Sequence, residues 1–503
     1  MDHDGAGETA DSKFNQHLSS KDEGFNMFKF LAKTLAVGHE MFGCRRTFSR
    51  HLLHKITTLA VPAAAALALQ LICKNQLKAE SIDRPNIILI LADDLGYNDL
   101  SCYGSKTMRT PEIDRMASEG VRLTSFYSGS TVCTPSRMAL LTGAYPTRVG
   151  WTGGVVGYRI PGEQGLAPQA LTIGEVFQDA GYKTGICGKW HLGDTPELLP
   201  MNQGFDTAFY IKRSNNQTKK LWRGDELVAD PFDNRRLTEQ FTRESIAFIK
   251  ENRSHPFFLY VPFTAPHFPA QGHPDWKGRS SNQAYGDVVE ELDSRVGEIL
   301  KTLKTEKLDR KTIVVFLSDN GPEPGQRKWA SAKPFRGLKW SSLEGGTRVP
   351  CIVRWPGVVP VAQESDDLIT SIDLLPTLAH ACGIDLKSVS EASPTIDGLN
   401  VWDTFILKDG TEHPRTNLLY WNGWAKLEAI RVGEWKLYLR EVKEVVGSAD
   451  GPVLIHLKVD PAETTNLAND HPAKVQAMTQ LAVQLTVDIK AHSIPLGDSK
   501  ASR

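Results

Sequence analysis

Two pairs of oxygen-bearing side chains are the first candidates for chemistry in this sequence. Asp93-Asp94 and Asp319-Asn320 each follow a continuous apolar run rich in branched residues. Such runs are typical of strands buried on both faces of a parallel sheet, and ligands bind beyond the carboxyl ends of those strands. Either pair alone could be an ordinary turn or helix cap. Together, three carboxylates and an amide predict a site for calcium or magnesium, and they suit zinc poorly.

The five residues Cys133-Thr134-Pro135-Ser136-Arg137 form a second candidate site. Proline favours the first turn of a helix, so we expect Cys133 at a helix N-terminus, where negative charge is stabilised. Arg137 lies about one helical turn further on and can face the same side as the cysteine. A single cysteine is more often an inert core residue. The surrounding residue types nevertheless favour a reactive position, because so specific a combination rarely arises by chance.

Alternating strands and helices are expected to hold both candidate sites. Apolar runs predict buried strands, and amphipathic stretches introduced by proline or closed by glycine predict helices. This alternation indicates an α/β fold with a large, mainly parallel sheet flanked by helices. The predicted strands are 86–92, 184–188, 256–262 and 312–317, and the predicted helices are 110–119, 171–180, 237–251 and 285–305.

Near residue 400 the alternation ends. Short strands between residues 418 and 439, followed by a helix over 473–489, predict a smaller antiparallel sheet with a terminal helix. We therefore expect a catalytic domain over residues 81–405 and a smaller C-terminal α+β subdomain over residues 406–495.

The composition excludes several classes of protein. The 503 residues include 58 basic and 59 acidic side chains, for a net charge of −1, and 41% are hydrophobic. A disordered chain would be less apolar and more charged, and a dedicated nucleic-acid binder would usually be basic. The seven cysteines are odd in number and show no C-x-x-C spacing. This argues against a disulfide scaffold or a zinc ribbon.

Residues 1–80 differ from the rest and are interpreted as a leader. Basic residues precede the mostly apolar segment 59–73. This pattern is typical of a secretory signal peptide and is too short for a stable membrane span. A hydrophobic helix that packs or anchors is the alternative. We expect translation to start at Met27 or Met41, and the chain to be exported to a periplasm, the extracellular space or a lysosome-like compartment.

The C-T-P-S-R segment resembles the C-x-P-S-R signature of sulfatases of the arylsulfatase A and N-acetylgalactosamine-6-sulfatase type. The resemblance runs in order from about residue 84 to residue 470. It implies the alkaline-phosphatase-like sulfatase fold and hydrolysis of sulfate esters, on a sulfated carbohydrate or an aryl sulfate. The supporting segments are PNIILILADDLGYNDL (85–100), GYKTGICGKWHLG (181–193), TAPH (264–267), FLSDNG (316–321), KWSSLEGGTRVP (339–350) and LIHLKVDPAETTNLA (454–468).

The resemblance also implies a role for each residue of the matched motifs. Cys133 would be oxidised to formylglycine by a formylglycine-generating enzyme and, once hydrated, would act as the nucleophile. Asp93, Asp94, Asp319 and Asn320 would bind one calcium ion, with the side chain at 133 completing the shell. Arg137 would hold the formylglycine hydroxyl, Lys189 and Lys339 would neutralise sulfate oxygens, His191 would take a proton from the diol, and His267 with Lys339 would protonate the leaving alcohol.

One loop departs from the family pattern. In Lys212-Arg213-Ser214 an arginine stands where the family usually has tyrosine. Ser214 is expected to approach the sulfate, and Lys212 and Arg213 to contact a second anionic group on a polysaccharide; a solvated loop is the alternative. Two other functions stay open: hydrolysis of phosphate or phosphonate monoesters or diesters on the same fold, and silent glycan binding if Cys133 is not modified.

Overall fold

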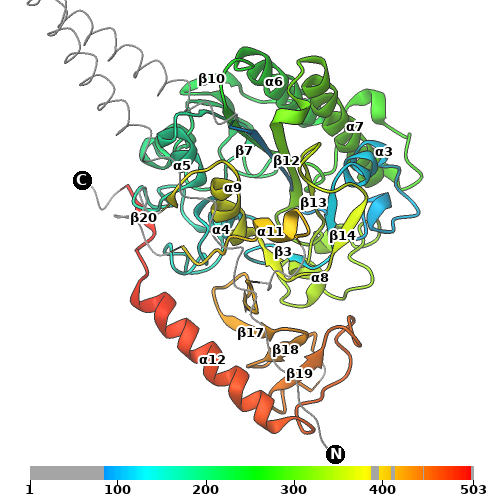
Figure 1. The fold of residues 1–503 in the computed structure, drawn as a ribbon, viewed down its shortest axis with the longest axis vertical. Coiled ribbons are helices and arrows are strands. Elements are labelled where there is room, and N and C mark those ends of the chain that lie inside the picture. Colours follow the sequence, from blue (N-terminus) through cyan, green and yellow to red (C-terminus); the bar gives the residue numbers. More distant parts are fainter. Residues whose placement is uncertain (1–83, 387–395, 409–413, 446, 500–503) are drawn as a thin grey trace, which may run out of the picture. The chain divides into compact units, whose positions relative to one another are not determined.

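The computed structural model describes residues 84–386, 396–408, 414–445 and 447–499. Ten strands in this part of the chain form one sheet (Figure 1). Their order is β10 (Glu226–Ala229), β9 (Leu221–Arg223), β8 (Thr207–Ile211), β7 (Lys183–Lys189), β11 (Phe257–Pro262), β1 (Asn86–Ala92), β12 (Thr312–Ser318), β13 (Cys351–Arg354), β2 (Val121–Leu123) and β14 (Gln363–Ser365). The five central strands β8, β7, β11, β1 and β12 run parallel to one another. Their carboxyl ends therefore meet at one edge.

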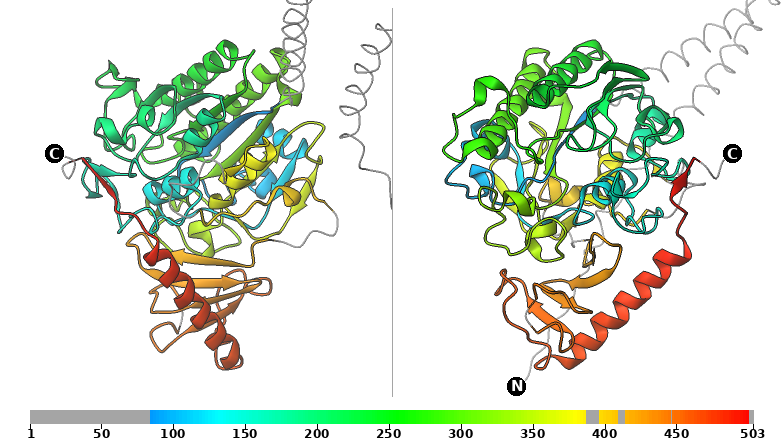
Figure 2. Two further views of the ribbon diagram at one scale, coloured as in Figure 1. Left: turned by 60° about the vertical axis from the view of Figure 1, so that its left-hand side comes forward. Right: turned by 180° about the vertical axis from the view of Figure 1, so that it is seen from behind.

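Helices cover both faces of this sheet (Figure 2). Along β1, Ile88 and Ile90 join the hydrophobic core of one face, whereas Ile87, Leu89 and Leu91 join the core of the other. This alternation follows from the two-residue period of a strand. The first core includes residues of α3 (Pro111–Ser118), α6 (Leu237–Glu251) and α7 (Gln283–Thr305), and the second those of α4 (Cys133–Thr142), α5 (Ile173–Asp179) and α9 (Leu374–Ala381).

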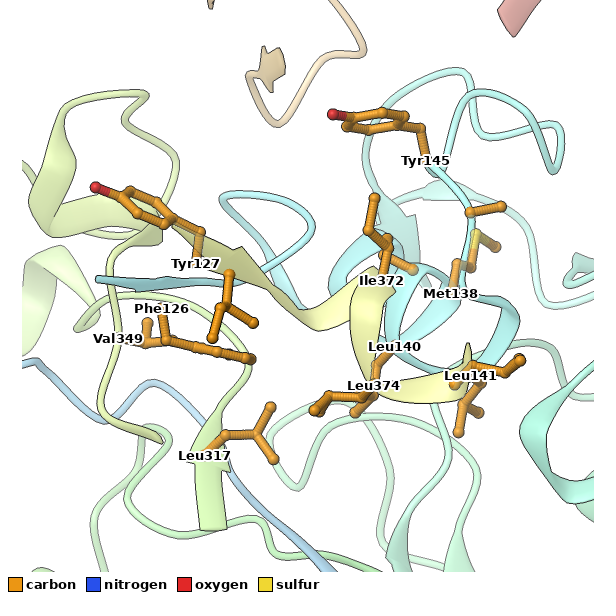
Figure 3. Close-up of a cluster of buried hydrophobic side chains, with 14 of the residues drawn as sticks. Phe126, Tyr127, Met138, Leu140, Leu141, Tyr145, Leu317, Val349, Ile372 and Leu374 are labelled. Atoms are coloured by element: carbon orange, nitrogen blue, oxygen red, sulfur yellow. The ribbon is translucent and has the colours of Figure 1, made fainter. Parts of the chain in front are cut away.

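Helix α4 is enclosed on all sides, and each of its ten residues is buried. Figure 3 shows its Met138, Leu140 and Leu141 beside Ile372 and Leu374. The same cluster continues to Leu317 of β12, to Val349 and to the short strand β3 (Phe126–Tyr127), which pairs with β15 (Ile369–Thr370). Because these contacts hold the helix tightly, its first residue, Cys133, has a fixed position at the carboxyl edge of the sheet.

The C-terminal part forms a second, antiparallel sheet. Strands β16 (Asn417–Trp421), β17 (Leu427–Val432), β18 (Trp435–Tyr438) and β19 (Val453–His456) pair in sequential order. Helix α12 (Pro472–Ala491) lies against β17 and β18, and β20 (Gly497–Asp498) returns to pair with β6 (Gln164–Gly165). Short helices α8 (Glu344–Thr347) and α11 (Trp402–Phe405) and the pair β4 (Val155–Val156) and β5 (Arg159–Ile160) complete the elements used below.

A buried charge cluster joins the two sheets. The ammonium group of Lys436 on β18 lies 2.9 Å from Oε1 of Glu344 on α8 and 2.9 Å from Oε1 of Glu463. The backbone N–H of Glu344 donates to Oε2 of Glu463 (2.8 Å). The C-terminal sheet is thereby tied to the segment that follows Lys339.

The predicted fold class is confirmed, with differences in detail. The helix expected over 171–180 begins at Ile173, because Thr172 is its N-cap. The hairpin of β9 and β10 was not foreseen, since its sequence has no sustained apolar alternation. Residues 59–73, interpreted as a signal peptide, lie outside the described residues. Among the residues that are described, no helix combines the length and the apolar character needed to cross a membrane.

Candidate active site

The two oxygen-bearing pairs meet because β1 and β12 are adjacent and in register, with Ala92 opposite Ser318. The backbone N–H of Asp94 donates to Oδ1 of Asp319 (3.1 Å), and the amide nitrogen of Asn320 donates to Oδ1 of Asp94 (2.7 Å). These bonds join Asp94, Asp319 and Asn320, and ligand atoms of Asp93 and Asp94 lie within 4.8 Å of each other.

Cys133 is the first residue of α4 and is only 2% exposed. Burial raises the pKa of its thiol, although the nearby charges of Lys189 and Lys339 act in the opposite direction. A thiol is a good nucleophile only as the thiolate. The unmodified cysteine is therefore poorly suited to attack a substrate.

Three buried cations each contact one of the three carboxylates. The ammonium of Lys189, at the end of β7, lies 2.6 Å from Oδ2 of Asp93, and that of Lys339 lies 2.8 Å from Oδ2 of Asp94. Arg137 donates from Nη2 to Oδ2 of Asp319 (2.9 Å) and from Nη1 to the backbone carbonyl of Lys189 (2.9 Å). Arg137 thus connects α4, β7 and the end of β12.

The pKa values of Asp93 and Asp319 shift in opposite directions. Burial alone would raise the pKa of Asp93, but Lys189, His267, Arg137 and Lys339 together hold it well below its usual range. Burial and the charge of Asp93 raise the pKa of Asp319 to about 7. One carboxyl of the cluster therefore tends to keep its proton until another positive charge is present.

The ring of His191 forms a hydrogen bond through only one of its two nitrogens among the described residues. Its Nε2 lies 2.9 Å from the backbone carbonyl of Val156 and must carry the hydrogen, because a carbonyl can only accept. Nδ1 is buried and has no hydrogen-bond partner within the described ranges of the chain. Burial, with the charges of Lys189 and Arg137, lowers the pKa of His191 well below its ordinary value. The arrangement suits a base that accepts a proton at Nδ1.

In His267 the hydrogen is on the other ring nitrogen. Its Nδ1 lies 2.7 Å from the carbonyl of Phe268 and 3.1 Å from Oδ1 of Asn215, so Nδ1 carries the hydrogen. Nε2 lies 3.6 Å from Oδ2 of Asp94. Burial, and next the charge of Lys339, lowers the pKa of His267 to about 4.

The donor set fits a hard divalent cation. Oδ1 of Asp93 and Oδ1 of Asn320 are buried and accept no hydrogen bond from any residue that the structure describes, and such atoms are rarely left without a partner. Single ligand atoms of Asp93, Asp94 and His267 all lie within 4.8 Å of one another. Carboxylate and amide oxygens are preferred ligands of calcium, so Asp93, Asp94, Asp319 and Asn320 could hold this ion.

The cations of the loop at residues 212–214 contact Asp194 and not the carboxylates of the catalytic cluster. Arg213 donates from Nε to Oδ2 of Asp194 (2.6 Å), and Lys212 donates to the backbone carbonyl of Asp194 (3.0 Å). Both cations therefore already have partners. Ser214 is buried, and its neighbour Asn215 contacts His267.

Sequence reasoning missed three residues around the site. Glu323 lies 3.2 Å from the ammonium of Lys339, Asn215 orients His267, and the hydroxyl of Tyr260 on β11 interacts with Arg137. Glu323 follows the Asp319-Asn320 motif closely and could have been noticed. Tyr260 could not, because within an apolar run it has the pattern of a core residue.

Comparisons with known proteins agree with this architecture. A family model described as Sulfatase matches residues 85–384. The mouse N-acetylgalactosamine-6-sulfatase is 35% identical over 412 residues, covering 76% of this chain and 76% of the relative. Human arylsulfatase A is 32% identical over 472 residues, covering 83% and 90%. The structure of Ps i-CgsB in complex with k-i-k-neocarrahexaose is 27% identical, with a TM-score of 0.72 and coverage of 83% and 96%.

Fold and site together define a hydrolase with the alkaline-phosphatase-like fold. Within that class, the chain belongs to the sulfatase family and is a sulfuric ester hydrolase.

Proposed function

We propose that this sulfatase removes sulfate from carbohydrates by means of a formylglycine formed from Cys133 and one calcium ion held by Asp93, Asp94, Asp319 and Asn320. The observation that carries the proposal is the arrangement around Cys133. The charges of Lys189, Lys339, Asp93 and Asp319 act on a buried thiol that is unsuited to attack by itself, and these residues belong to the cluster of oxygen-bearing side chains and cations described above.

A sulfated carbohydrate is favoured as substrate for two reasons. Relatives of this chain are named as N-acetylgalactosamine-6-sulfatases, and the structure of Ps i-CgsB holds an oligosaccharide. The site itself supplies what an anionic ester needs, since Lys189, Lys339 and Arg137 concentrate positive charge at the carboxyl edge. Arg213 and Lys212 contact Asp194, and their contact with a second anionic group of a polysaccharide stays a proposal.

The proposed reaction depends on the formylglycine and calcium on the one hand and on the side chains of the protein on the other. A hydrated formylglycine at position 133 would supply an oxygen nucleophile, and a calcium ion held by Asp93, Asp94, Asp319 and Asn320 would polarise the sulfate and favour loss of the nucleophile's proton. Arg137 holds the side chain at position 133 from one helical turn away. Lys189 and Lys339 bind sulfate oxygens and offset the charge that grows on them during attack.

The histidines move the protons. Nδ1 of His191 accepts a proton from the side chain at position 133, so that sulfate can be released. Nε2 of His267, together with Lys339, delivers a proton to the leaving alcohol. The anionic substrate raises the pKa of His267 from its low value, which makes protonation at Nε2 possible in the complex.

Mass analysis of the protein from its native host tests the modification. The peptide containing residue 133 should be lighter than its unmodified form by about 18 Da, the difference between cysteine and formylglycine. Finding only intact cysteine in that protein would contradict the proposal and favour silent glycan binding. Preparation together with a formylglycine-generating enzyme should restore the mass change, which would make that enzyme a partner.

Turnover measurements test the reaction and the metal. Wild-type protein should hydrolyse 4-nitrophenyl sulfate much faster than 4-nitrophenyl phosphate, and Cys133→Ala should abolish both activities. A preference for the phosphate would favour phosphoester chemistry on the same fold. Dialysis against a chelator should remove one calcium ion per chain, measured by elemental analysis, and calcium should restore activity.

We also propose that the chain is exported, with residues 59–73 as its signal peptide. The sequence pattern supports this, and sequencing of the N-terminus of the secreted protein tests it. A mature chain that retains residues 59–73 would contradict it.

A further inference from the structure

Three aromatic side chains from separate segments form an exposed cluster. The rings of Trp340 and Trp424 stack with centroids 4.9 Å apart and an interplanar angle of 26°. Tyr158 meets both edge-on, at centroid distances of 6.4 and 6.2 Å. Tyr158 is 52% exposed and Trp424 37%. The guanidinium of Arg159 lies 4.4 Å from the ring centroid of Trp424. We call these four residues the aromatic cluster.

The chain connects this cluster directly to the candidate active site. Trp340 follows Lys339, and its backbone N–H donates to the carbonyl of Thr131 (2.9 Å), two residues before Cys133. Tyr158 comes two residues after Val156, whose carbonyl accepts the hydrogen bond from His191 and whose N–H donates to Oγ1 of Thr134 (3.1 Å). The cluster therefore borders the place where a sulfate ester would react.

The backbone around the aromatic cluster has several features that fix the positions of its rings. A Cβ atom on Gly423 would lie 2.2 Å from the ring of Trp340, so only glycine allows the ring to pack there. Trp340 and Arg159 have φ angles of 79° and 70°, a left-handed conformation that is unfavourable for side chains of this size. The N–H of Gly154 donates to the carbonyl of Gly423 (2.8 Å), which ties the two loops together.

Packing between the two sheets does not by itself explain the exposure. Aromatic rings that serve only to join two parts of a protein are expected to be covered, because burial is what stabilises the contact. Here the outermost ring, Tyr158, has more than half of its surface open. Arg159 beside it is exposed and forms no ion pair with a carboxylate in the described part of the chain. An exposed ring next to a cation fits a ligand with an apolar face and an anionic group.

We propose that the aromatic cluster is a subsite for the pyranose ring next to the sulfated sugar, so that the enzyme acts on oligosaccharides or polysaccharides rather than on isolated sulfated monosaccharides. The proposal rests on the proposed function. Sugar rings have an apolar C–H face that packs on aromatic rings, while the guanidinium of Arg159 binds a sulfate or carboxylate of the same sugar.

Steady-state kinetics of the variants Tyr158→Ala and Trp424→Ala test the subsite. The probes are sulfated tetrasaccharides from chondroitin 6-sulfate, heparin and κ-carrageenan, each with its sulfated monosaccharide. For the tetrasaccharide that wild-type enzyme uses, each variant should lower kcat/KM about tenfold, mainly through KM. Hydrolysis of the matching monosaccharide should change less than about threefold. Tyr158→Phe keeps the ring and should behave like the wild type.

Trp355→Ala is the matched control. Trp355 follows β13, which runs antiparallel to β12, so it lies at the edge of the sheet opposite the site; its removal should leave the ratio of the two activities unchanged. An equal loss on tetrasaccharide and monosaccharide, or no loss on either, would overturn the subsite. Circular dichroism establishes that each variant is folded.

A direct binding measurement separates this proposal from the proposed function. The tetrasaccharides should quench the tryptophan fluorescence of calcium-loaded protein even if no sulfate is released, and Tyr158→Ala should weaken this binding. Binding without turnover would contradict the proposed function and leave the subsite standing. Turnover of 4-nitrophenyl sulfate without binding of any of the three tetrasaccharides would contradict the subsite and leave sulfate-ester hydrolysis standing.

Discussion

The two histidines of the site differ in which ring nitrogen is free. This difference predicts that replacing each histidine affects a different step of the reaction. His191 presents a buried, unpartnered Nδ1. If it accepts a proton only in the step that releases sulfate, His191→Ala should still release the first equivalent of alcohol rapidly. Steady-state turnover should then fall about 100- to 10,000-fold. Stopped-flow measurement of 4-nitrophenol from 4-nitrophenyl sulfate should show a burst close to one equivalent per active site.

His255→Ala provides the control, because His255 is exposed and precedes the amino end of β11, at the edge of the sheet opposite the site; it should behave as wild type. A folded His191→Ala protein with slow release from the first turnover onward would show that His191 acts in the attack step instead.

Asp99 makes the stability of the protein depend on pH. It is buried and accepts hydrogen bonds from the backbone N–H groups of Gly96 and Ser331 and from the hydroxyl of Tyr285. Burial raises its pKa from 3.8 to about 7, although these bonds oppose the shift. Between these values the folded state binds more protons than the unfolded state, so this carboxyl lowers stability as pH rises from about 4 to about 7.

Replacing the carboxyl should remove that part of the pH dependence. Asp99→Asn cannot ionise, so its free energy of unfolding should fall less steeply between pH 5 and 7 than that of the wild type. The difference in slope should be at most about 1.4 kcal/mol per pH unit. Urea unfolding at several pH values measures both slopes. Identical slopes would show that Asp99 titrates normally.

At the scale of the elements, the sequence predicted the parts of the site that depend on strand ends. Asp93 and Asp319 follow apolar runs, and parallel strands bring their carboxyl ends to one edge. The ion pairs were not predictable, because they join residues far apart in sequence. Arg213 illustrates this: its charge suggested an anionic ligand, whereas its guanidinium contacts Asp194, and nothing in the sequence pairs these two residues.

The N-terminus of α5 gives a local test of element stability. Oγ1 of Thr172 accepts from the backbone N–H of Glu175 (3.1 Å), and the carboxylate of Glu175 accepts from the N–H of Thr172 (2.8 Å). Thr172→Ala should lower the free energy of unfolding by about 1 kcal/mol, and Thr172→Ser should restore most of it. Thr479→Ala, at an exposed position within α12, should have less effect in the same denaturant titration.

For the whole molecule, the charge cluster of Lys436, Glu344 and Glu463 is one of the connections between the two sheets, beside the shared hydrophobic core and the pairing of β20 with β6. Burial favours the uncharged forms, but Lys436 lowers the pKa of Glu344 to about 2, so the pair stays ionised. Tyr420 and Tyr438 donate hydroxyl hydrogens to Glu344 (3.1 Å) and Glu463 (2.5 Å). Because the buried charges of this network are hydrogen-bonded, we expect it to couple the unfolding of one sheet to the unfolding of the other.

Removing the shared cation should therefore weaken the entire described fold. Lys436→Ala removes the ammonium that Glu344 and Glu463 share, although Glu344 keeps the guanidinium of Arg348 at 3.5 Å, and should cost about 3–5 kcal/mol, measured by chemical denaturation. Lys458→Ala is the matched control, because Lys458 pairs with Glu434 at the surface of the same sheet (3.0 Å), and it should leave stability unchanged within error. Glu463→Gln added to Lys436→Ala should recover part of the loss by removing one unpaired charge. Calorimetry should show one transition for the wild type, whereas two well-separated transitions would mean that the C-terminal sheet unfolds independently and that the cluster is not what couples them.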